Sequence, residues 1–267
     1  MRESIKVFAP ATVANVGCGY DVLGFALEGY GDELILTRRP DDRLVIASIE
    51  GVQGLPLDPL KNVSTAAINA LLTDLDLKQG FDLRIKKNIA AGSGLGSSAS
   101  SAAAAVYAAN EILGRPKSQL ELINYAMAGE KLASTKAHAD NVAPSILGGF
   151  TAVRSYEPLD VFNISYPESL KVVVIFPQIE IKTSDAKKIL RDEVKLTDAV
   201  KQWGNMAGLI SGLIEHDFER IGKSLQDVIV EPVRSILIPF YHQMKTLALE
   251  KGALGFSISG SGPSMFC

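Results

Sequence analysis

The 267-residue chain has only two cysteines, Cys18 and Cys267. They lack the spacing of a disulfide framework or of a zinc-ligand pair, so the sequence predicts a cytoplasmic protein. Basic charge is not in excess either, because 27 Lys and Arg face 30 Asp and Glu for a net charge of −3. Such a chain has no positive electrostatic field that would attract nucleic-acid phosphates, and we expect no nucleic-acid partner.

Long apolar runs are missing as well. Residues 1–8 contain no apolar stretch of the length that a signal peptide needs. The most apolar long stretch, residues 100–109, is mostly alanine and is shorter than the roughly 20 residues of a membrane-spanning helix. We therefore expect no membrane partner. With 47% hydrophobic and 21% charged residues, the composition excludes a mainly disordered chain.

The patterns that are present indicate a mixture of helices and strands. In the first half, strands are expected at 5–9, 33–38, 43–49 and 81–87, and helices at 63–75, 98–113 and 118–135. Ser118 and Glu121 have the spacing of a capping box at the start of the last of these helices. Further along we expect a connection at 156–168, a strand at 171–176, a helix-rich run over 184–250 and a strand at 254–259.

A loop rich in glycine and serine leads into the expected helix at 98–113. Gly92, Gly94 and Gly96 let the backbone approach a ligand closely, and the free N–H groups of the first helical turn attract an anion. The loop lacks the lysine of a Walker A loop and the acidic residue of the dinucleotide fingerprint. It predicts a phosphate cradle of another type. The alternative is a flexible turn followed by a serine N-cap.

Glu130 falls within the apolar stripe of the expected helix at 118–135, so its carboxylate should point into the interior. Burying a carboxylate costs free energy unless a cation or hydrogen bonds compensate it. One interpretation is a buried ion pair with Lys86, Lys87 or Lys136. The other is a divalent cation, and Mg²⁺ fits because one or two carboxylates and substrate phosphates usually hold it. The loop upstream favours the metal.

Four stretches of the chain resemble the motifs of one enzyme family. The loop at 89–100 resembles the ATP loop of the GHMP small-molecule kinases, with Ala90 where that family usually has proline. The glycine motif at 255–263 resembles the one that these kinases carry near their C-terminus. Within the family, the strings at 10–24 and 138–150 are similar to those of the homoserine kinases.

This resemblance implies an α+β, two-domain GHMP kinase fold with the active site in the cleft between the domains. Residues 1–165 would form an N-terminal ATP-binding domain of the ribosomal-protein-S5-domain-2-like type. Residues 166–267 would form a C-terminal ferredoxin-like α/β sandwich. Because family members continue past the glycine motif at 255–263, we expect this second domain to be incomplete and to lack its last strand and helix.

The resemblance also implies an activity, which is ATP-dependent phosphorylation of the hydroxyl of L-homoserine in threonine biosynthesis. Its partners would be ATP, Mg²⁺ and L-homoserine, and a homodimer is a further hypothesis. Two alternatives remain open: a GHMP kinase for another small alcohol, such as mevalonate or shikimate, and a non-catalytic ligand sensor with the same fold. The presence of both Ser98 and Glu130 argues against the sensor.

Site residues follow from the resemblance, position by position. The implied nucleotide-binding residues are Asn62, Ala91, Gly92, Ser93, Gly94, Leu95, Gly96, Ser97, Ser98, Ala99 and Ser100, and the metal ligands are Ser98 and Glu130. The implied substrate-binding residues are Asn15, Asp21, His138, Asp140, Asn141, Thr183, Lys187, Arg234 and Gly260. Lys187 stands where the family generally has arginine, and lysine offers a carboxylate no bidentate fork. Structural roles are the alternatives: an N-cap for Asn62, turn caps for Asn15 and Asp21, a buried imidazole for His138 and a surface ion pair for Arg234.

The residues expected to act in catalysis are Ser98, Glu130, His138 and Asn141. Several relatives have Asp where this chain has Asn141, and an amide cannot take a proton as a base. We therefore predict that the homoserine hydroxyl, oriented by Asn141 and His138, attacks the γ-phosphate directly and loses its proton late. A histidine base at His138 is the alternative.

Overall fold

The computed structural model describes residues 2–52, 54–133, 138–179, 181 and 183–267. Within these ranges, one large sheet combines strands β1 (Ser4–Ala14), β2 (Leu23–Arg39), β3 (Leu44–Glu50), β4 (Gly80–Lys86), β5 (Phe150–Tyr156) and β6 (Leu159–Ile164). The strand order is β3-β4-β2-β5-β6, and β1 pairs with β2 off this path. The pairing of β3 with β4 is parallel and the other pairings are antiparallel.

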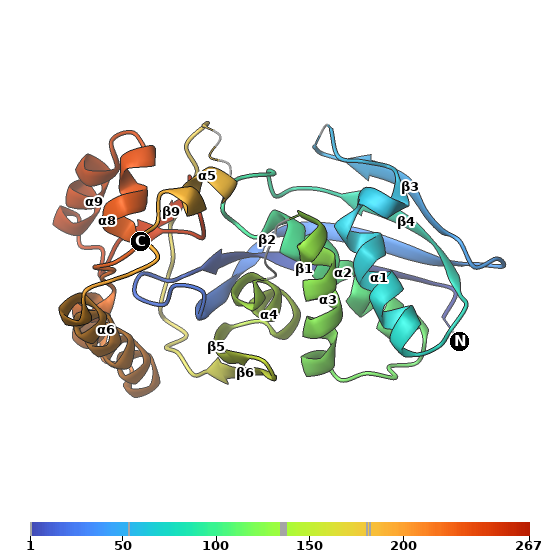
Figure 1. Ribbon diagram of the computed structural model, residues 1–267, viewed down its shortest axis with the longest axis horizontal. Helices are drawn as coiled ribbons and strands as arrows, with labels where there is room; N and C mark the ends of the chain where they lie inside the picture. The colour runs from blue at the N-terminus through green and yellow to red at the C-terminus, as the bar shows by residue number, and fades with distance from the viewer. Residues whose placement is uncertain (1, 53, 134–137, 180, 182) are drawn as a thin grey trace.

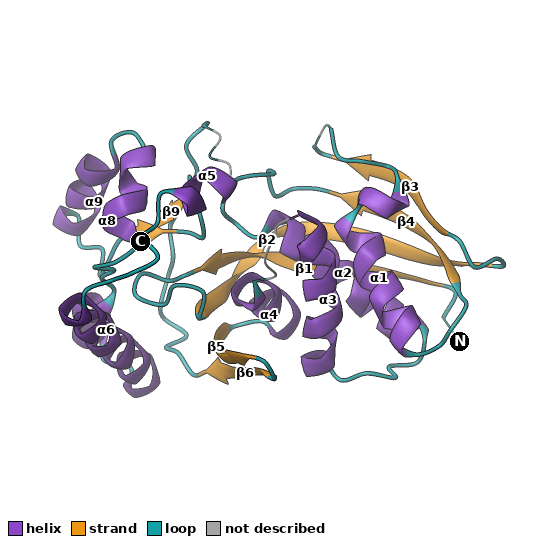
Figure 2. Ribbon diagram, in the orientation of Figure 1, coloured by secondary structure: helices purple, strands orange, loops and turns teal. Residues whose placement is uncertain are grey.

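Helices cover this sheet and bury an alanine-rich core. They are α1 (Val63–Asp74), α2 (Ser97–Ile112), α3 (Gln119–Ala133) and α4 (Ala139–Leu147), grouped together in Figure 2. The alanines of α2 are buried, because their small side chains let α1, α3, α4 and the sheet approach its backbone closely. In β4, buried Phe81, Leu83 and Ile85 alternate with less buried polar residues, so one face of the strand packs on the helices.

The rest of the chain packs at the end of the molecule opposite the N-terminus (Figure 1). It contains α5 (Thr183–Lys188), α6 (Leu196–Glu215), α7 (Phe218–Ser224), α8 (Glu231–Arg234) and α9 (Tyr241–Glu250). A small sheet in the order β7-β9-β8 joins β7 (Val174–Ile175), β8 (Ser257–Ile258) and β9 (Met265–Phe266). Short 3-10 helices occur at Pro59–Lys61 and Ser235–Leu237. Leu209, Leu213 and Phe266 share an apolar cluster with Val13 and Leu23, which joins this part to the large sheet.

The helices expected in the first half are confirmed to within about two residues at each described end, the usual uncertainty of helix boundaries, while residues 134 and 135 of the third lie outside the described part of the chain. The capping box is confirmed too. The Ser118 N–H donates to Glu121 Oε2 at 2.8 Å, and the Glu121 N–H donates to Ser118 Oγ at 3.3 Å. Of the described helices, none is long and apolar enough to cross a membrane.

The predictions for three segments of the second half are wrong. The connection expected at 156–168 is largely strand, because β6 pairs with β5 as an antiparallel hairpin around Glu157 and Pro158. The strand expected at 171–176 shrinks to Val174–Ile175, and the strand expected at 254–259 shrinks to Ser257–Ile258. These apolar runs have little sheet to pair with, since β9 is their shared partner. The large sheet ends with β6 at Ile164, while the domain boundary near 165 stays a prediction.

Candidate active site

A cavity of about 430 Å³ opens where the glycine-serine loop meets α3, α4 and the turn after β1. Most of the expected site residues line it, although they come from distant parts of the chain. They are Asn15, Asp21, Asn62, Ala91, Gly92, Ser93, Gly94, Gly96, Ser97, Ser98, Glu130, His138, Asp140, Asn141, Arg234 and Gly260. The fold therefore brings the nucleotide and substrate residues of the resemblance to one place.

Other expected residues are not brought to the cavity. Leu95 and Ala99 are buried in the apolar clusters. Ser100 is buried and bonded inside the protein, because its hydroxyl donates to the Ala9 carbonyl at 2.9 Å and its N–H donates to the Gly96 carbonyl at 2.8 Å. Its hydroxyl therefore fastens α2 to β1, where a nucleotide contact was expected. The side chains of Thr183 and Lys187 lie outside the part of the chain that the structure describes.

The glycine-serine loop has a defined geometry. Gly92, Gly94 and Gly96 all have positive φ, at +69°, +80° and +68°, which glycine adopts without strain. Helix α2 begins at Ser97 with Gly96 as its N-cap, so the serine N-cap of the alternative interpretation is wrong. A glycine N-cap leaves the first-turn N–H groups without a side-chain acceptor. The loop presents these donors beside the cavity and suits an anion.

The loop is also held from both sides, unlike a flexible turn. From the C-terminal glycine motif, Ser259 Oγ donates to the Gly94 carbonyl at 2.7 Å, and the Ser264 N–H donates to the Ser93 carbonyl at 3.1 Å. A Cβ on Gly94 would lie 2.6 Å from the Ser259 carbonyl oxygen, so only glycine fits there. On the opposite side, the Thr12 N–H donates to the Leu95 carbonyl at 3.1 Å.

Glu130 is buried as expected, with 7% of the residue exposed. Burial raises the pKa of its carboxyl above the usual range, and a hydrogen bond with Ser98 opposes that shift. Its Oε1 atom has no hydrogen-bond partner among the described residues. Lys86 and Lys87 are paired elsewhere, with Glu33 and Asp32 respectively, and Lys136 lies outside the described residues. An unpartnered carboxylate oxygen beside a serine hydroxyl fits a divalent cation.

Acidic groups gather at the other end of the cavity. His138 Nδ1 lies 3.3 Å from Asp21 Oδ1. Asp140 is buried, and its Oδ1 has no hydrogen-bond partner within the described part of the chain. Burial, with the charge of Asp21 adding to it, raises the pKa of Asp140 to about 7. Such a carboxyl would regain its charge beside a cationic ligand group.

Arg234 supplies the cation of this region. It is buried, so the surface ion pair of the alternative interpretation is wrong. Its Nη1 donates to the Gly260 carbonyl at 3.0 Å and its Nε donates to the Ala186 carbonyl at 3.2 Å. The guanidinium lies 5.2 Å from the centre of the Tyr20 ring. Because its positive charge has no carboxylate among these contacts, Arg234 can attract one from a ligand.

The structural roles of two site amides are confirmed. Asn62 is the N-cap of α1, where its side chain accepts from the Ser64 N–H at 2.9 Å. Asn15 closes a turn by accepting from the Asp21 N–H at 3.0 Å, and its Nδ2 donates to the Gly260 carbonyl at 2.7 Å. Both residues also line the cavity, so a structural role and a ligand contact are compatible.

Thr12 supports a residue of the site, a role that the sequence did not reveal. It is fully buried in β1, and its Oγ1 donates to Asn141 Oδ1 at 2.8 Å. Both atoms face Gly96, where an added Cβ would lie 2.1 Å from Thr12 Oγ1 and 2.9 Å from Asn141 Oδ1. The sequence signal for Thr12 was a polar residue among the small apolar residues of β1. That signal did not identify Asn141 as its partner.

Comparison with known proteins agrees with this geometry. Residues 62–149 match the GHMP kinases N terminal domain, and residues 209–267 match the GHMP kinases C terminal domain. The chain belongs to the GHMP kinase family. The expected GHMP kinase fold is thereby confirmed.

Curated relatives of this GHMP kinase carry the name homoserine kinase. The one from Chloroherpeton thalassium is 47% identical over 275 residues, covering 99% of this chain and 86% of the relative. The one from Pyrococcus furiosus is 42% identical, covering 98% of this chain and 87% of the relative.

Solved structures of GHMP kinases agree. A crystal structure of homoserine kinase from Cytophaga hutchinsonii has a TM-score of 0.96 at 51% identity, covering 100% of this chain and 85% of that one. An L. major mevalonate kinase structure has a TM-score of 0.74 at 15% identity, which shows the shared fold alone.

Proposed function

We propose that this kinase transfers the γ-phosphoryl group of ATP to the hydroxyl of L-homoserine and so forms O-phospho-L-homoserine for threonine biosynthesis. One observation carries the proposal: a single cavity joins an anion-binding helix start to a set of opposite charges that suits an amino acid. Homoserine kinases at 42–51% identity over nearly the whole chain support it.

The charges at the substrate end match the poles of a zwitterionic amino acid. Arg234 would hold the carboxylate, because its guanidinium is buried beside Gly260 with no carboxylate partner among the contacts given above. Asp140, with Asp21 nearby, would hold the ammonium, since a cation restores the charge that burial opposes. Thr183 and Arg234 would close the pocket from the second half of the chain, and Lys187 would add a point charge for the carboxylate. The hydroxyl of homoserine would then face the glycine-serine loop.

The nucleotide end suits ATP with Mg²⁺. The N–H groups at the start of α2 would bind the phosphates, and Ser98 with Glu130 would hold the metal ion. Bound Mg²⁺ supplies positive charge that offsets the charge on the transferred phosphoryl group. The orphaned Oε1 of Glu130 is the observation that makes these residues fit the ion. Asn62 would lie near the adenine.

Asn141 would orient the attacking hydroxyl. Its Oδ1 accepts the hydrogen bond from Thr12 Oγ1, which would leave the Nδ2 donors for a ligand in the cavity that Asn141 lines. An amide in that position donates to the hydroxyl oxygen and aligns it, but it takes no proton. The proton is then lost late, to phosphate or water, and His138 helps to position the substrate while Asp21 orients its imidazole.

The other two candidate functions have less support. A kinase for mevalonate or shikimate would not need an anchor for an ammonium group, which Asp140 and Asp21 provide. A ligand sensor would not need an unpartnered buried carboxylate next to Ser98. A homodimer and a cytoplasmic location stay predictions.

The product identifies the reaction directly. Incubation with ATP, MgCl₂ and L-homoserine should give a new phosphomonoester signal in the ³¹P NMR spectrum, with one ADP formed for each phosphomonoester. The mass of the product should be that of O-phosphohomoserine. Binding of ADP without any phosphomonoester would instead support the sensor.

A further inference from the structure

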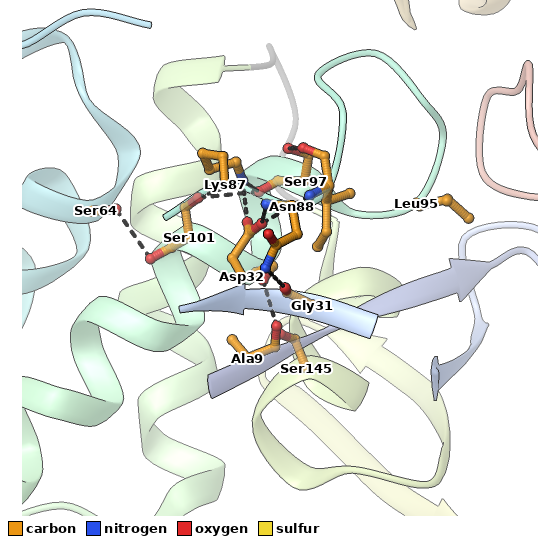
Figure 3. Close-up of polar contacts among 12 residues, drawn as sticks. Ala9, Gly31, Asp32, Ser64, Lys87, Asn88, Leu95, Ser97, Ser101 and Ser145 are labelled. Atoms are coloured by element: carbon orange, nitrogen blue, oxygen red, sulfur yellow. Dashed lines mark hydrogen bonds and ion pairs between the residues drawn. The ribbon is translucent and has the colours of Figure 1, made fainter. Parts of the chain in front are cut away.

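Lys87 follows β4 directly, and its side chain is buried under the glycine-serine loop (Figure 3). It lines the cavity, yet the reaction above gives it no role, and the sequence offered it only as one possible ion-pair partner of Glu130. Lys86, the preceding residue, is different because its side chain is exposed and lies 3.7 Å from Glu33 at the surface. The two lysines therefore form a natural pair for comparison.

The ammonium of Lys87 is fully engaged within the protein. It donates to the carboxylate of Asp32, to the Ser97 carbonyl at 2.7 Å and to Ser101 Oγ at 2.8 Å. An ammonium has three N–H donors, and these three acceptors use all of them. Burial lowers the pKa of Lys87, and the charge of Asp32 opposes that shift. No N–H remains for a phosphate, so direct phosphate binding is not the role that these contacts indicate.

Asp32 connects this ammonium to the other end of the loop. The carboxylate is buried in β2, and its Oδ1 accepts the N–H of Asn88 at 2.8 Å and the N–H of Ile89 at 3.0 Å. Asn88 is held further, because its Nδ2 donates to the Gly31 carbonyl at 2.7 Å. Figure 3 shows these bonds meeting around Asp32 of β2, close to the start of α2.

The loop is thus tied at both of its ends. Asn88 and Ile89 precede it, Ser97 and Ser101 follow it, and the Lys87–Asp32 ion pair joins the two sides. A buried ion pair is rarely more stabilising than apolar residues of the same volume, so stability alone gives little reason for this one. Fixed geometry gives a better reason, because binding to a preorganised loop avoids the entropy cost of ordering it.

We propose that Lys87 is a positioning residue for phosphoryl transfer. Together with Asp32 it holds the two ends of the glycine-serine loop at a fixed separation, so that the N–H groups at the start of α2 face the phosphates before the nucleotide binds. This role rests on the proposed function only in requiring that the loop binds nucleotide phosphates.

The test compares Lys87→Met combined with Asp32→Asn against Lys86→Met. The double variant removes both charges of the Lys87–Asp32 ion pair, and the new amide oxygen can still accept from Asn88 and Ile89. Hydrogen exchange of the ligand-free chain is measured at the amides of residues 88–101, with α6 as an internal reference. The dissociation constant of ADP with Mg²⁺ is measured by calorimetry.

We expect the double variant to fold and to exchange its amides at 88–101 about tenfold faster than Lys86→Met, while α6 is unchanged. ADP should bind about tenfold more weakly than to Lys86→Met, and the KM for ATP should rise while the KM for L-homoserine stays constant. If the double variant does not fold, Ser101→Ala removes one acceptor of Lys87 and should shift exchange and ADP binding in the same direction by a smaller factor.

Two results would overturn the proposal. Unchanged exchange and unchanged ADP affinity in a folded variant would make the ion pair an ordinary part of the core. Weaker ADP binding with unchanged exchange of the ligand-free chain would make Lys87 a direct phosphate ligand. Hydrogen exchange and ADP binding do not use homoserine, so failure to phosphorylate homoserine would refute the proposed function alone.

Discussion

Glu130 is a residue whose surroundings oppose its charge unless a cation is present. Burial raises the pKa of the carboxyl, and Ser98 offers it one hydrogen bond. A protein has no thermodynamic reason to keep such a group for the stability of the ligand-free chain. Function and stability should therefore respond in opposite directions when the charge is removed.

Glu130→Gln tests this separation. The amide keeps the shape of the side chain but loses the charge that would hold Mg²⁺, so kcat should fall about 100-fold or more. The melting temperature of the ligand-free chain should stay the same or rise, because a neutral amide costs less to bury. Steady-state kinetics and thermal unfolding measure the two effects. Glu219→Gln, which changes an exposed carboxylate on α7, is the control and should alter neither value. A near-normal kcat for Glu130→Gln would refute the metal assignment.

Asp140 predicts a pH dependence of stability. Its pKa is raised from a usual 3.8 to about 7 in the fold, so between these values the folded chain holds a proton that the unfolded chain has released. The stability of the ligand-free chain relative to Asp140→Asn should therefore fall as pH rises through this window, by about 1 kcal/mol per pH unit. Urea unfolding of both chains from pH 4 to about pH 7 measures it. A constant difference over that range would show that Asp140 is not buried in a low-dielectric site.

Single residues were predictable from the sequence where their own element determined their environment. Glu130 is such a case, because helical spacing alone placed it on the buried face of α3. Thr12 is the opposite case, since its partner Asn141 lies 129 residues further along the chain. Arg234 also depended on distant contacts, and the alternative of a surface ion pair was wrong for that reason. A spacing rule cannot reveal partners that the fold brings together.

At the scale of elements, α2 has a left-handed glycine at each end with very different surroundings. Gly96, at the N-cap, has φ +68° and faces Thr12 and Asn141. Gly114, just past the C-cap, has φ +91°, and a Cβ there would meet no described atom within 4 Å. The two glycines allow backbone strain to be separated from crowding of the site.

Gly96→Ala should therefore reduce kcat and Gly114→Ala should not. Both substitutions put a side chain in the left-handed region, which costs about 1–2 kcal/mol of stability. Only Gly96→Ala also pushes a Cβ into Thr12 Oγ1 and Asn141 Oδ1, so kcat should fall about tenfold or more. Urea unfolding measures the stability of both variants, and steady-state kinetics measures their kcat. Equal kcat values would contradict the position assigned to Asn141.

Elements were predictable where local pattern and capping agreed. Helices α1, α2 and α3 have that agreement, and the Ser118–Glu121 capping box marks the start of α3. The β5–β6 hairpin was missed because Glu157 and Pro158 read as part of an irregular connection, whereas the strands on either side pair with each other. Strand β2 extends over Leu23–Arg39, yet its glycines interrupt the alternating pattern that identifies a strand.

At the scale of the whole molecule, the glycine motif near the C-terminus packs against the glycine-serine loop and holds its backbone in place. Ser259 and Ser264, near the C-terminus, both bond to loop carbonyls. The Gly260 N–H donates to the Ala14 carbonyl at 3.1 Å, which fixes the C-terminal motif to β1 as well. The motif at 255–263 was recognisable in the sequence, but its docking onto the loop was not.

Ser259→Ala should weaken nucleotide binding through this contact. It removes the hydrogen bond to the Gly94 carbonyl, so stability should fall by about 1 kcal/mol and the KM for ATP should rise severalfold. Ser257→Ala is the matched control, because that serine is equally buried but donates to Glu231 Oε2 at 2.8 Å. It should lose similar stability with no change in the KM for ATP. A similar rise in both variants would show that the effect is not specific to the loop.

The central claim is that one cavity directs the phosphoryl group of ATP to the hydroxyl of a zwitterionic amino acid. The most direct test is kcat/KM for ADP release at saturating ATP and Mg²⁺ with L-homoserine, mevalonate, shikimate and galactose in turn. The charges of Asp140 and Arg234 predict that L-homoserine exceeds each of the others by about 100-fold or more. A higher value for another alcohol, or no release above that of Glu130→Gln with any of them, would contradict it.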